Sequence, residues 1–569
     1  MIPVIERGQI DGVPVLRSDA RSGRNMAALV FRVGHFDETL PISGVTHMVE
    51  HLTFAGRPEA RYHFNASVSG RYTSFHMESP EPDDIRDFVE TVCQGLAADH
   101  RAVIDRERMI LRTEAASRGG AGALGTCLAE RYGATGPGLA NYREFGLLRL
   151  GWPDVEAWRR SWFTAQNAVL WICGPVPYGL RVSLPYGAPP YGAPLPAREL
   201  RPLGLTLPAY TTGARGGVAM SLVSPRAVRY RIALDVLQRR LTQVLRHEHG
   251  TTYGVQLSSE ELDRDLMHSW VAADALAEQT PMAAHGMLTT FQSLCAAGCE
   301  YGEIKDYVRR AAEAYESPAG PAMLLQGMAH ATLSGRPARE ARDLLREADE
   351  TTPADVGRAA QALYDQMLVA APGVLPAVQG RMGMVPAWSS RLVTGKRHKS
   401  ADSDAILTTG DEGVMLTGGP GKHVTVRYDS VAALLRWNDG RQALVGDDGF
   451  VVQLDPDEWP GGRAIPDSVA ARVPPDVVID LEEPGPRRAG RGTARTEKDT
   501  SQPAAERKPP AGRAHSRRRL IMTLRILYAV LILVGIAGAV AGFPQGIFLS
   551  VACGAALVRM EMQYGRLRR

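Results

Sequence analysis

The sequence predicts an α+β fold: two related α/β halves of antiparallel sheets with flanking helices, then a small β-rich domain, a disordered basic linker and a transmembrane helical hairpin. Three observations support this prediction. The 569 residues are too many for a single hydrophobic core. Similar helix-then-strand segments recur within the first 376 residues, and after residue 474 the composition turns first Pro- and Arg-rich and then apolar. We place the parts at residues 1–180, 200–372, 385–475, 476–519 and 520–569.

The two halves are indicated by a repeated pattern. The segments PDVEAWRRSWFTAQNAVLWICGPV (153–176) and ADVGRAAQALYDQMLVAAPGVLP (354–376) each contain an amphipathic helix and then a short apolar strand that ends beside Pro and Gly. Between the halves, SLPYGAPPYGAPLPARELRPLG (183–204) is too rich in proline for a helix or a central strand. We therefore expect this stretch to be a linker.

The region 385–475 alternates apolar and polar residues between turn-forming residues, as in NDGRQALVGDDGFVVQL (438–454). This period of two predicts antiparallel strands. The helix-like AIPDSVAARV (464–473) follows, and strands closed by a terminal helix resemble the pleckstrin-homology-like fold. No catalytic pattern is present there, so a docking or spacer module is expected, with lipid binding as an alternative.

The C-terminal tail predicts a membrane anchor. ILYAVLILVGIAGAVAGF (526–543) has no charge, and GIFLSVACGAALV (546–558) follows after a Pro-Gln break, which suits two short spans. Arginines flank both outer ends, so the positive-inside rule places the folded part on the cytoplasmic side of the cell membrane. A re-entrant second segment and a buried helical hairpin are the alternatives. The basic linker either contacts anionic lipid or is simply solvated.

Composition restricts the partners and the compartment. The segment from Gly485 to Arg519 has 11 Lys or Arg and 3 acids, a net charge of +8, and the segment from Leu520 onward has 5 Arg and 1 Glu, a net charge of +4. Because the whole chain carries +3, residues 1–484 carry about −9. An acidic folded part argues against nucleic acid as a partner. The six cysteines form no CxxC pair, so a reducing compartment is expected. The N-terminus has no apolar run typical of a secretory signal peptide.

The candidate site begins with THMVEHLTF (46–54). On a helix, His47 and His51 are four residues apart and project from the same face, so their imidazoles could share one metal ion. Glu50 lies beside them, where a carboxylate could accept a proton from a metal-bound water without being a ligand. This is the HxxEH order, the reverse of the commoner HExxH motif.

Three motifs in order carry a resemblance to a known family. HMVEHLTFAG, FNASVSGRYTSFH and RERMILRTE resemble the HxxEH helix, the Asn-Ala edge strand and the third-ligand helix of the pitrilysin and insulinase family of inverzincin peptidases, which includes the mitochondrial processing peptidases. The resemblance runs from residue 1 to about 372. It implies a Zn²⁺ ion held by His47, His51 and Glu114, with Glu50 as the catalytic base. The interval from His51 to Glu114 is shorter than is usual in the family. The family's second helix glutamate, seven residues after the ligand, would fall on Ala121, so Glu107 is the candidate to support the histidines instead.

The second half contains RHEHGTTYGV, in which Arg246 and Tyr253 are seven residues apart. The resemblance implies that this pair holds the substrate carbonyl and stabilises the oxyanion, and that Asn65 and Ala66 pair with the substrate backbone. The chain has only one unit of two halves, which implies a homodimer or a heterodimer with a related subunit, with Arg246 and Tyr253 acting across it. Nearby, His76, His247 and His249 are expected to be ordinary strand or surface residues.

These observations predict a membrane-tethered zinc metalloendopeptidase that hydrolyses peptides or unfolded segments. A non-catalytic relative, anchored at the membrane as a peptide-binding or scaffolding subunit, is the alternative.

Overall fold

The computed structural model describes residues 3–19, 23–57, 60–118, 122–188, 206–214, 216–373 and 382–482. The chain divides into two units, Met1–Pro486 and Arg487–Arg569, and the described residues belong to the first. The predicted hairpin (520–569) and most of the predicted linker lie outside the described residues. Among those described, no helix has both the length and the apolar composition of a membrane span.

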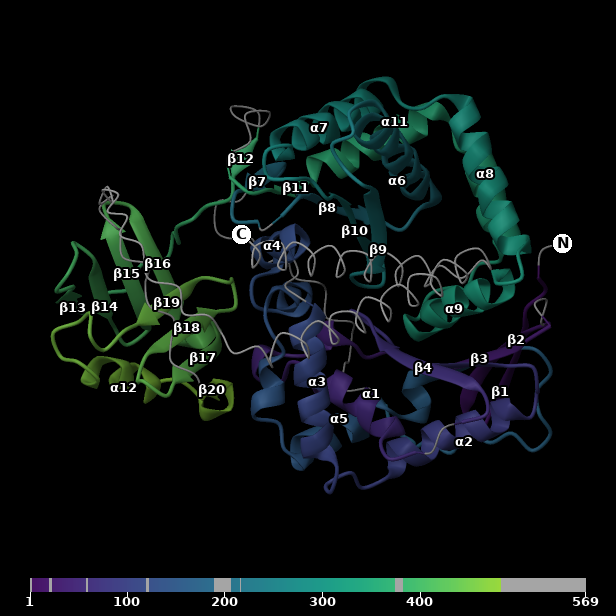
Figure 1. The fold of residues 1–569 in the computed structure, drawn as a ribbon, viewed down its shortest axis with the longest axis horizontal. Coiled ribbons are helices and arrows are strands. Elements are labelled where there is room, and N and C mark those ends of the chain that lie inside the picture. The colour runs from purple at the N-terminus through teal and green to yellow at the C-terminus, as the bar shows by residue number, and fades with distance from the viewer. Residues whose placement is uncertain are drawn as a thin grey trace, which may run out of the picture. The chain divides into compact units, whose positions relative to one another are not determined.

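The first half is built on a six-stranded sheet in the order β1-β2-β6-β3-β5-β4 (Figure 1). Its strands are β1 (Glu6–Ile10), β2 (Val13–Ser18), β3 (Asn25–Phe31), β4 (His63–Val68), β5 (Thr73–Ser79) and β6 (Ala168–Cys173). Only β2 and β6 run parallel. Its helices are α1 (Val45–Phe54), α2 (Asp84–Ala97), α3 (Ile104–Arg118), α4 (Gly122–Tyr132) and α5 (Trp152–Trp162), with short turns η1 (His35–Asp37), η2 (Leu40–Ile42), η3 (Gly136–Asn141), η4 (Phe145–Leu148) and η5 (Ala165–Asn167).

The second half has a six-stranded sheet in the order β12-β7-β11-β8-β10-β9. Its strands are β7 (Ala209–Thr211), β8 (Val218–Pro225), β9 (Val255–Glu261), β10 (Leu266–Ala273), β11 (Leu368–Ala370) and β12 (Gly383–Met384). Its helices are α6 (Val228–Leu241), the π-helical η6 (Thr242–Glu248), α7 (Thr280–Ala297), α8 (Tyr301–Glu316), α9 (Gly320–Leu333), α10 (Ala341–Glu350) and α11 (Pro353–Asp365).

The halves share one topology, as the sequence repeat predicts. In each sheet a parallel pair (β2 with β6, β7 with β11) is followed by the same three antiparallel neighbours. The two repeated segments coincide with α5–β6 and α11–β11, so the repeat marks the helix that leads into the parallel strand. In both halves the last strand of the series, β4 or β9, forms an edge.

Each half also contributes one helix that packs on the sheet of the other half. Helix α4 belongs to the first half by sequence, yet Ala123 and Cys127 pack among Ala219 and Leu368 of the second sheet. Helix α9 belongs to the second half, yet Leu325 and its neighbours pack on strands β2, β3 and β6 of the first sheet (Figure 1). Each sheet is therefore covered by its own helices on one face and by a helix of the other half on the opposite face.

The β-rich region forms two four-stranded sheets, in the orders β13-β14-β15-β16 and β19-β18-β17-β20. The elements are β13 (Lys396–Lys399), β14 (Ile406–Thr409), β15 (Gly413–Gly419), β16 (Lys422–Arg427), η7 (Tyr428–Ser430), β17 (Val431–Trp437), β18 (Gln442–Gly446), β19 (Val451–Leu454), α12 (Ala464–Ala470), η8 (Pro475–Val477) and β20 (Val478–Leu481). The predicted boundary at 475 is wrong, because β20 lies in the predicted linker and pairs in parallel with β17. Helix α12 is therefore not the last element, unlike in the predicted pleckstrin-homology-like pattern.

The β-rich module packs against the first half next to η4. Ala433, Ile479 and Leu481 of the module share a buried cluster with Leu40 and Phe145. Arg149 donates a hydrogen bond to the carbonyl of Asp476 at 2.8 Å. Gly133, at φ +65°, approaches the module so closely that a Cβ there would lie 2.0 Å from the carbonyl oxygen of Asp447. The contact needs glycine at this position.

Candidate metal centre

Helix α1 carries the candidate site because its two faces differ. Val45, Met48, Val49 and Leu52 recur at helical spacing and are all buried in the core of the first half. That packing leaves His47, Glu50 and His51 together. One possible ligand atom from each lies within 4.8 Å of the others, a grouping that could hold a metal ion. In the structure the three residues thus lie together on one side of the helix.

The N-terminus of α1 is held in place by a buried carboxylate. Glu38 accepts hydrogen bonds from the backbone N–H of Gly44 at 2.8 Å and of Thr46 at 2.9 Å, which satisfies two donors that the helix leaves open. Burial, with a smaller contribution from the charge of Glu144, raises the pKa of Glu38 to about 7, although the two backbone hydrogen bonds lower it. Trp158 on α5 donates to the hydroxyl of Thr46 at 3.1 Å. The helix that carries the histidines is thus fixed at its start.

Helix α3 brings a third donor to the two imidazoles. Oε2 of Glu114 lies 3.6 Å from Nε2 of His47 and 3.5 Å from Nε2 of His51. Two ligands at the usual Zn–N and Zn–O distances, set at a tetrahedral angle, lie about 3.3 Å apart. The separations in this structure therefore fit one tetrahedral ion with Glu114 as the third ligand, as the sequence predicts.

Glu50 also faces the two imidazoles, from slightly further away. Its Oε2 lies 3.9 Å from Nε2 of His47 and 3.7 Å from Nε2 of His51. Geometry alone would allow Glu50 to be a ligand. The resemblance of its helix, rather than these small differences in distance, assigns Glu114 as the ligand and leaves Glu50 beside the ion, where it could exchange a proton with a water.

Each histidine has a carboxylate behind it. Nδ1 of His47 hydrogen bonds to Oε1 of Glu144 at 3.1 Å, and Nδ1 of His51 lies 3.6 Å from Oε2 of Glu107. Glu107 is itself held by Arg106, which donates to its Oε1 at 2.8 Å. A carboxylate at Nδ1 orients the ring and leaves Nε2 free to bind a metal. Sequence reasoning named Glu107 but missed Glu144, which lies in an irregular segment 97 residues from His47 and has no local pattern that marks it.

The approach of Glu144 depends on Gly44. Gly44 adopts φ +90°, and a Cβ there would lie 2.9 Å from Cβ of Glu144 and 3.0 Å from Cγ of Leu147. Only glycine meets both conditions without strain. Gly44 therefore starts α1 and makes room for the carboxylate behind His47.

The electrostatics of the cluster favour a cation. Burial lowers the pKa of His47, but the hydrogen bond to Glu144 and the charges of Glu144, Glu50 and Glu114 outweigh it and raise this pKa. Four carboxylates surround two imidazoles, an excess of negative charge that a divalent cation would neutralise. With two nitrogen donors and one oxygen donor, the residues fit zinc.

Arg246 and Tyr253 lie together at the start of the second edge strand. Arg246 is carried by the π-helical η6, and its Cζ lies 5.3 Å from the ring centroid of Tyr253. Tyr253 is 67% exposed. Within the described part of the chain, the contacts of Arg246 are with Tyr253, and none joins it to His47 or His51. The structure thus places Arg246 beside Tyr253.

Asn65 and Ala66 lie on β4, at the free edge of the first sheet, as the sequence predicts. The side chain of Asn65 accepts a hydrogen bond from the backbone N–H of Ala66 at 2.9 Å. Strand β4 is linked to the site helix through Phe64, whose ring centroid lies 4.6 Å from that of Phe54 on α1. The edge has backbone groups available for another strand.

No protein-family model and no curated protein matches this chain. Solved structures do. The first half of the periplasmic protease PqqL from Escherichia coli matches with a TM-score of 0.50 and 14% identity over 66% of this chain and 93% of that one. A protease from Helicobacter pylori matches with 0.51 and 14% over 65% and 99%. A peptidase M16 inactive domain from Pseudomonas fluorescens matches with 0.52 and 16% over 65% and 99%.

These likenesses concern the fold, because the identities are low and one neighbour is described as inactive. The HxxEH cluster on α1 is an independent observation from this chain. Together they confirm the resemblance that the motifs predict: this chain has the fold of the M16, or pitrilysin-type, peptidases.

Proposed function

We propose that this protein is a zinc-dependent endopeptidase that cleaves peptides or unfolded segments. The observation that carries the proposal is the convergence of Nε2 of His47, Nε2 of His51 and Oε2 of Glu114, with pairwise distances of 3.5 and 3.6 Å to the carboxylate. A zinc ion held there would supply a Lewis acid that activates water. The M16 fold agrees with this chemistry.

Three glutamates of the chain have separate roles in hydrolysis. The carboxylate of Glu50 accepts a proton from the attacking water as its oxygen adds to the peptide carbonyl carbon. When the C–N bond breaks, Glu50 returns that proton to the leaving amine. Glu144 and Glu107 keep the two imidazoles in orientation throughout.

The substrate is proposed to add as a strand to β4. Ala66 pairs with Phe75 of β5 on one side, and by the alternation of antiparallel strands its own N–H faces the open edge. The hydrogen bond from this N–H to Asn65 would have to be replaced by one to the substrate backbone. Recognition through backbone groups suits a peptidase that reads extended segments more than particular side chains.

Arg246 and Tyr253 are proposed to complete the site from a second subunit, either a copy of this chain or a related chain. Their contact with each other and their exposure support this proposal. The pair would hold the carbonyl oxygen and stabilise the oxyanion. An equimolar mixture of inactive Glu50→Gln and Arg246→Ala chains should regain part of the activity, since one site per dimer would then be intact. No recovery would contradict a site shared between two copies of this chain.

Membrane attachment through residues 520–569, with the peptidase part on the cytoplasmic side, is also proposed, and rests on the sequence of the tail. Separation of membranes from soluble material, with and without these residues, tests it. Wild type in the membrane fraction and the shortened chain in the soluble fraction is the expected result.

The test of the central proposal is metal content followed by cleavage of an unstructured peptide. We expect one zinc per chain, and Glu50→Gln should keep the zinc but lose activity by about 10²-fold or more. Glu90→Gln, on the exposed face of α2, is the matched control and should change neither.

A non-catalytic peptide-binding or scaffolding role is the second candidate, favoured by the inactive M16 domain among the structural neighbours. It predicts peptide binding without turnover. A metal-free protein, or a zinc-loaded one with equal and negligible activity in wild type and Glu50→Gln, would support this role.

A further inference from the structure

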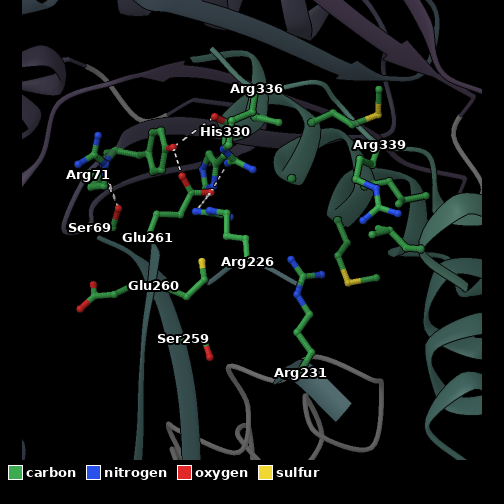
Figure 2. A pocket seen from close by; sticks show the side chains of 18 of the residues that line it. Ser69, Arg71, Arg226, Arg231, Ser259, Glu260, Glu261, His330, Arg336 and Arg339 are labelled. Atoms are coloured by element: carbon green, nitrogen blue, oxygen red, sulfur yellow. Dashed lines mark hydrogen bonds and ion pairs between the residues drawn. The ribbon is translucent and has the colours of Figure 1, made fainter. Parts of the chain in front are cut away.

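A second cavity, distinct from the metal centre, lies where the two halves meet. Its volume is about 490 Å³ (Figure 2). It is lined by the β4–β5 turn (69–72) of the first half and by the start of α6, the end of β9 and the α9–α10 region of the second. None of the residues of the metal centre lines it.

Positive charge dominates the lining. Five arginines face two glutamates: Arg71, Arg226, Arg231, Arg336 and Arg339 against Glu260 and Glu261. Three positive charges therefore remain without an acid in the lining. This excess stands out because residues 1–484 carry about −9 overall. A surface with such an excess of positive charge attracts an anion.

Several of these guanidinium groups are buried with donors unused. Arg71 is only 5% exposed, and its Nε makes no hydrogen bond. Nε of Arg226 and Nε of Arg336 are likewise buried without a hydrogen bond, whereas Nη2 of Arg226 lies 2.7 Å from Glu261. A buried donor without an acceptor is costly. These buried nitrogens add positive charge beside the cavity, whereas the exposed guanidinium of Arg231 is a group that a ligand oxygen can reach.

Of the two acids in the lining, Glu261 is already engaged. Glu261 lies 2.7 Å from Nη2 of Arg226 and 2.7 Å from Nη2 of Arg336, and it accepts a hydrogen bond from Tyr72. Burial lowers the pKa of Arg226, and the neighbouring charge of Arg336 lowers it further. One carboxylate between two arginines leaves the remaining charge of the cavity unbalanced.

The rest of the lining defines the shape of the ligand. In Figure 2, Arg231 and Arg339 reach toward the space beside Arg226. Arg231 has no ion pair or hydrogen bond in the described part of the chain, and Arg339 pairs with Glu347 at 2.6 Å. Apolar side chains complete the wall, namely Met267, Met323, Leu324, Met328 and Leu344. The cavity is therefore cationic on one side and apolar on another.

We propose that this cavity binds a small molecule that carries a phosphate group on an apolar body. Guanidinium forks match phosphate oxygens in pairs. Because Glu347 outside the lining already pairs with Arg339, two positive charges remain uncompensated, which suits a dianion. The volume of about 490 Å³ lies in the range of small-molecule sites and exceeds the space that a lone phosphate needs. The bound group would join Arg71 of the first half to arginines of the second, so it would hold the two halves together.

The test is calorimetric titration of the full-length chain with phenyl phosphate, inorganic phosphate, benzoate and benzyl alcohol. Phenyl phosphate should bind most tightly, inorganic phosphate more weakly, and benzyl alcohol not at all. Loss of a charge-assisted contact in Arg231→Ala should weaken phenyl phosphate binding about tenfold or more. Arg231→Glu should abolish it. Arg397→Ala removes an exposed arginine of β13 and should leave binding unchanged.

Arg231 is exposed and has no hydrogen bond or ion pair with another described residue, so its variants should fold, which circular dichroism checks. Three results would overturn the proposal. They are the absence of phenyl phosphate binding to the wild type, equal affinity for benzoate, and equal affinities in Arg231→Ala and Arg397→Ala.

Discussion

At the scale of single residues, the candidate metal centre combines side chains that the sequence predicts with one that it does not. His47, Glu50 and His51 follow from helical spacing alone, and Glu114 follows from the resemblance of its helix. Glu144 could not be predicted, because it reaches His47 from an irregular loop, and only the folded chain brings them within 3.1 Å. Residues that act through contacts distant in sequence leave no local pattern.

Glu144→Ala should weaken zinc binding about 10- to 100-fold, because Nδ1 of His47 loses its acceptor and the ring its fixed orientation. Competition with a chelating dye measures the zinc affinity. Glu90→Ala removes an exposed helical carboxylate and should have no effect. Equal affinities in the two variants would show that Glu144 does not support the ligand.

Gly44→Ala should lower the free energy of unfolding by more than Gly56→Ala. Both glycines have positive φ, +90° and +72°, but a Cβ at position 44 meets Glu144 at 2.9 Å while position 56 has open space. The left-handed conformation alone costs about 1 kcal/mol for alanine. The excess loss in Gly44→Ala, measured by denaturant unfolding, therefore reports the contacts with Glu144 and Leu147. Equal losses would rule those contacts out.

At the scale of elements, the sequence located the site helix, the edge strand β4 and the repeated α5–β6 and α11–β11 segments, because each has its own periodicity. It missed β20, since a four-residue strand that pairs in parallel with β17 is defined by its distant partner. It also gave no sign that α4 and α9 cover the sheets of the opposite halves. Amphipathic patterns show that a helix has an apolar face, and they do not say what covers it.

Helix α9 makes the contact between the halves sensitive to pH. The ring of His330 stacks on Tyr72 with centroids 3.8 Å apart, and burial lowers its pKa from 6.5 to about 4. Between these values the unfolded chain binds a proton that the folded chain does not, so stability should rise with pH across this window. The difference in pKa corresponds to at most about 3 kcal/mol.

His330→Gln should flatten this dependence. Urea midpoints of wild type and variant at pH 4 and pH 7 measure it, and taking the difference between the two proteins cancels the titration of the other histidines. A wild-type midpoint that falls no further than that of the variant at pH 4 would contradict the prediction.

At the scale of the whole molecule, the β-rich module is joined to the peptidase-like part through the segment that carries Glu144. Phe145, the next residue, lies in the same buried cluster as Ile479 and Leu481. Residues 476–482, predicted as linker, therefore contribute to the packing behind the metal centre.

Ile479→Asp should destabilise the first half and weaken zinc binding, because a buried unpaired charge would disrupt the cluster around Phe145. Val451→Asp, on β19 at 39% exposure, places the same charge at the surface of the same module and should have little effect. Thermal unfolding and zinc affinity, measured for both variants, test this prediction. Unchanged zinc affinity in a folded Ile479→Asp would confine the role of the module to stability.

The exchange of α4 and α9 has a consequence for how the protein is made. As the chain leaves the ribosome, the first sheet is complete in sequence once β6 has emerged, yet its second face stays bare until residues 320–333 follow. Conversely, helix α4, which covers one face of the second sheet, is synthesised before the strands of that sheet. Neither half has a complete hydrophobic core on its own. A fragment that ends between the halves should therefore precipitate or bind chaperones. The two halves should fold together in one step.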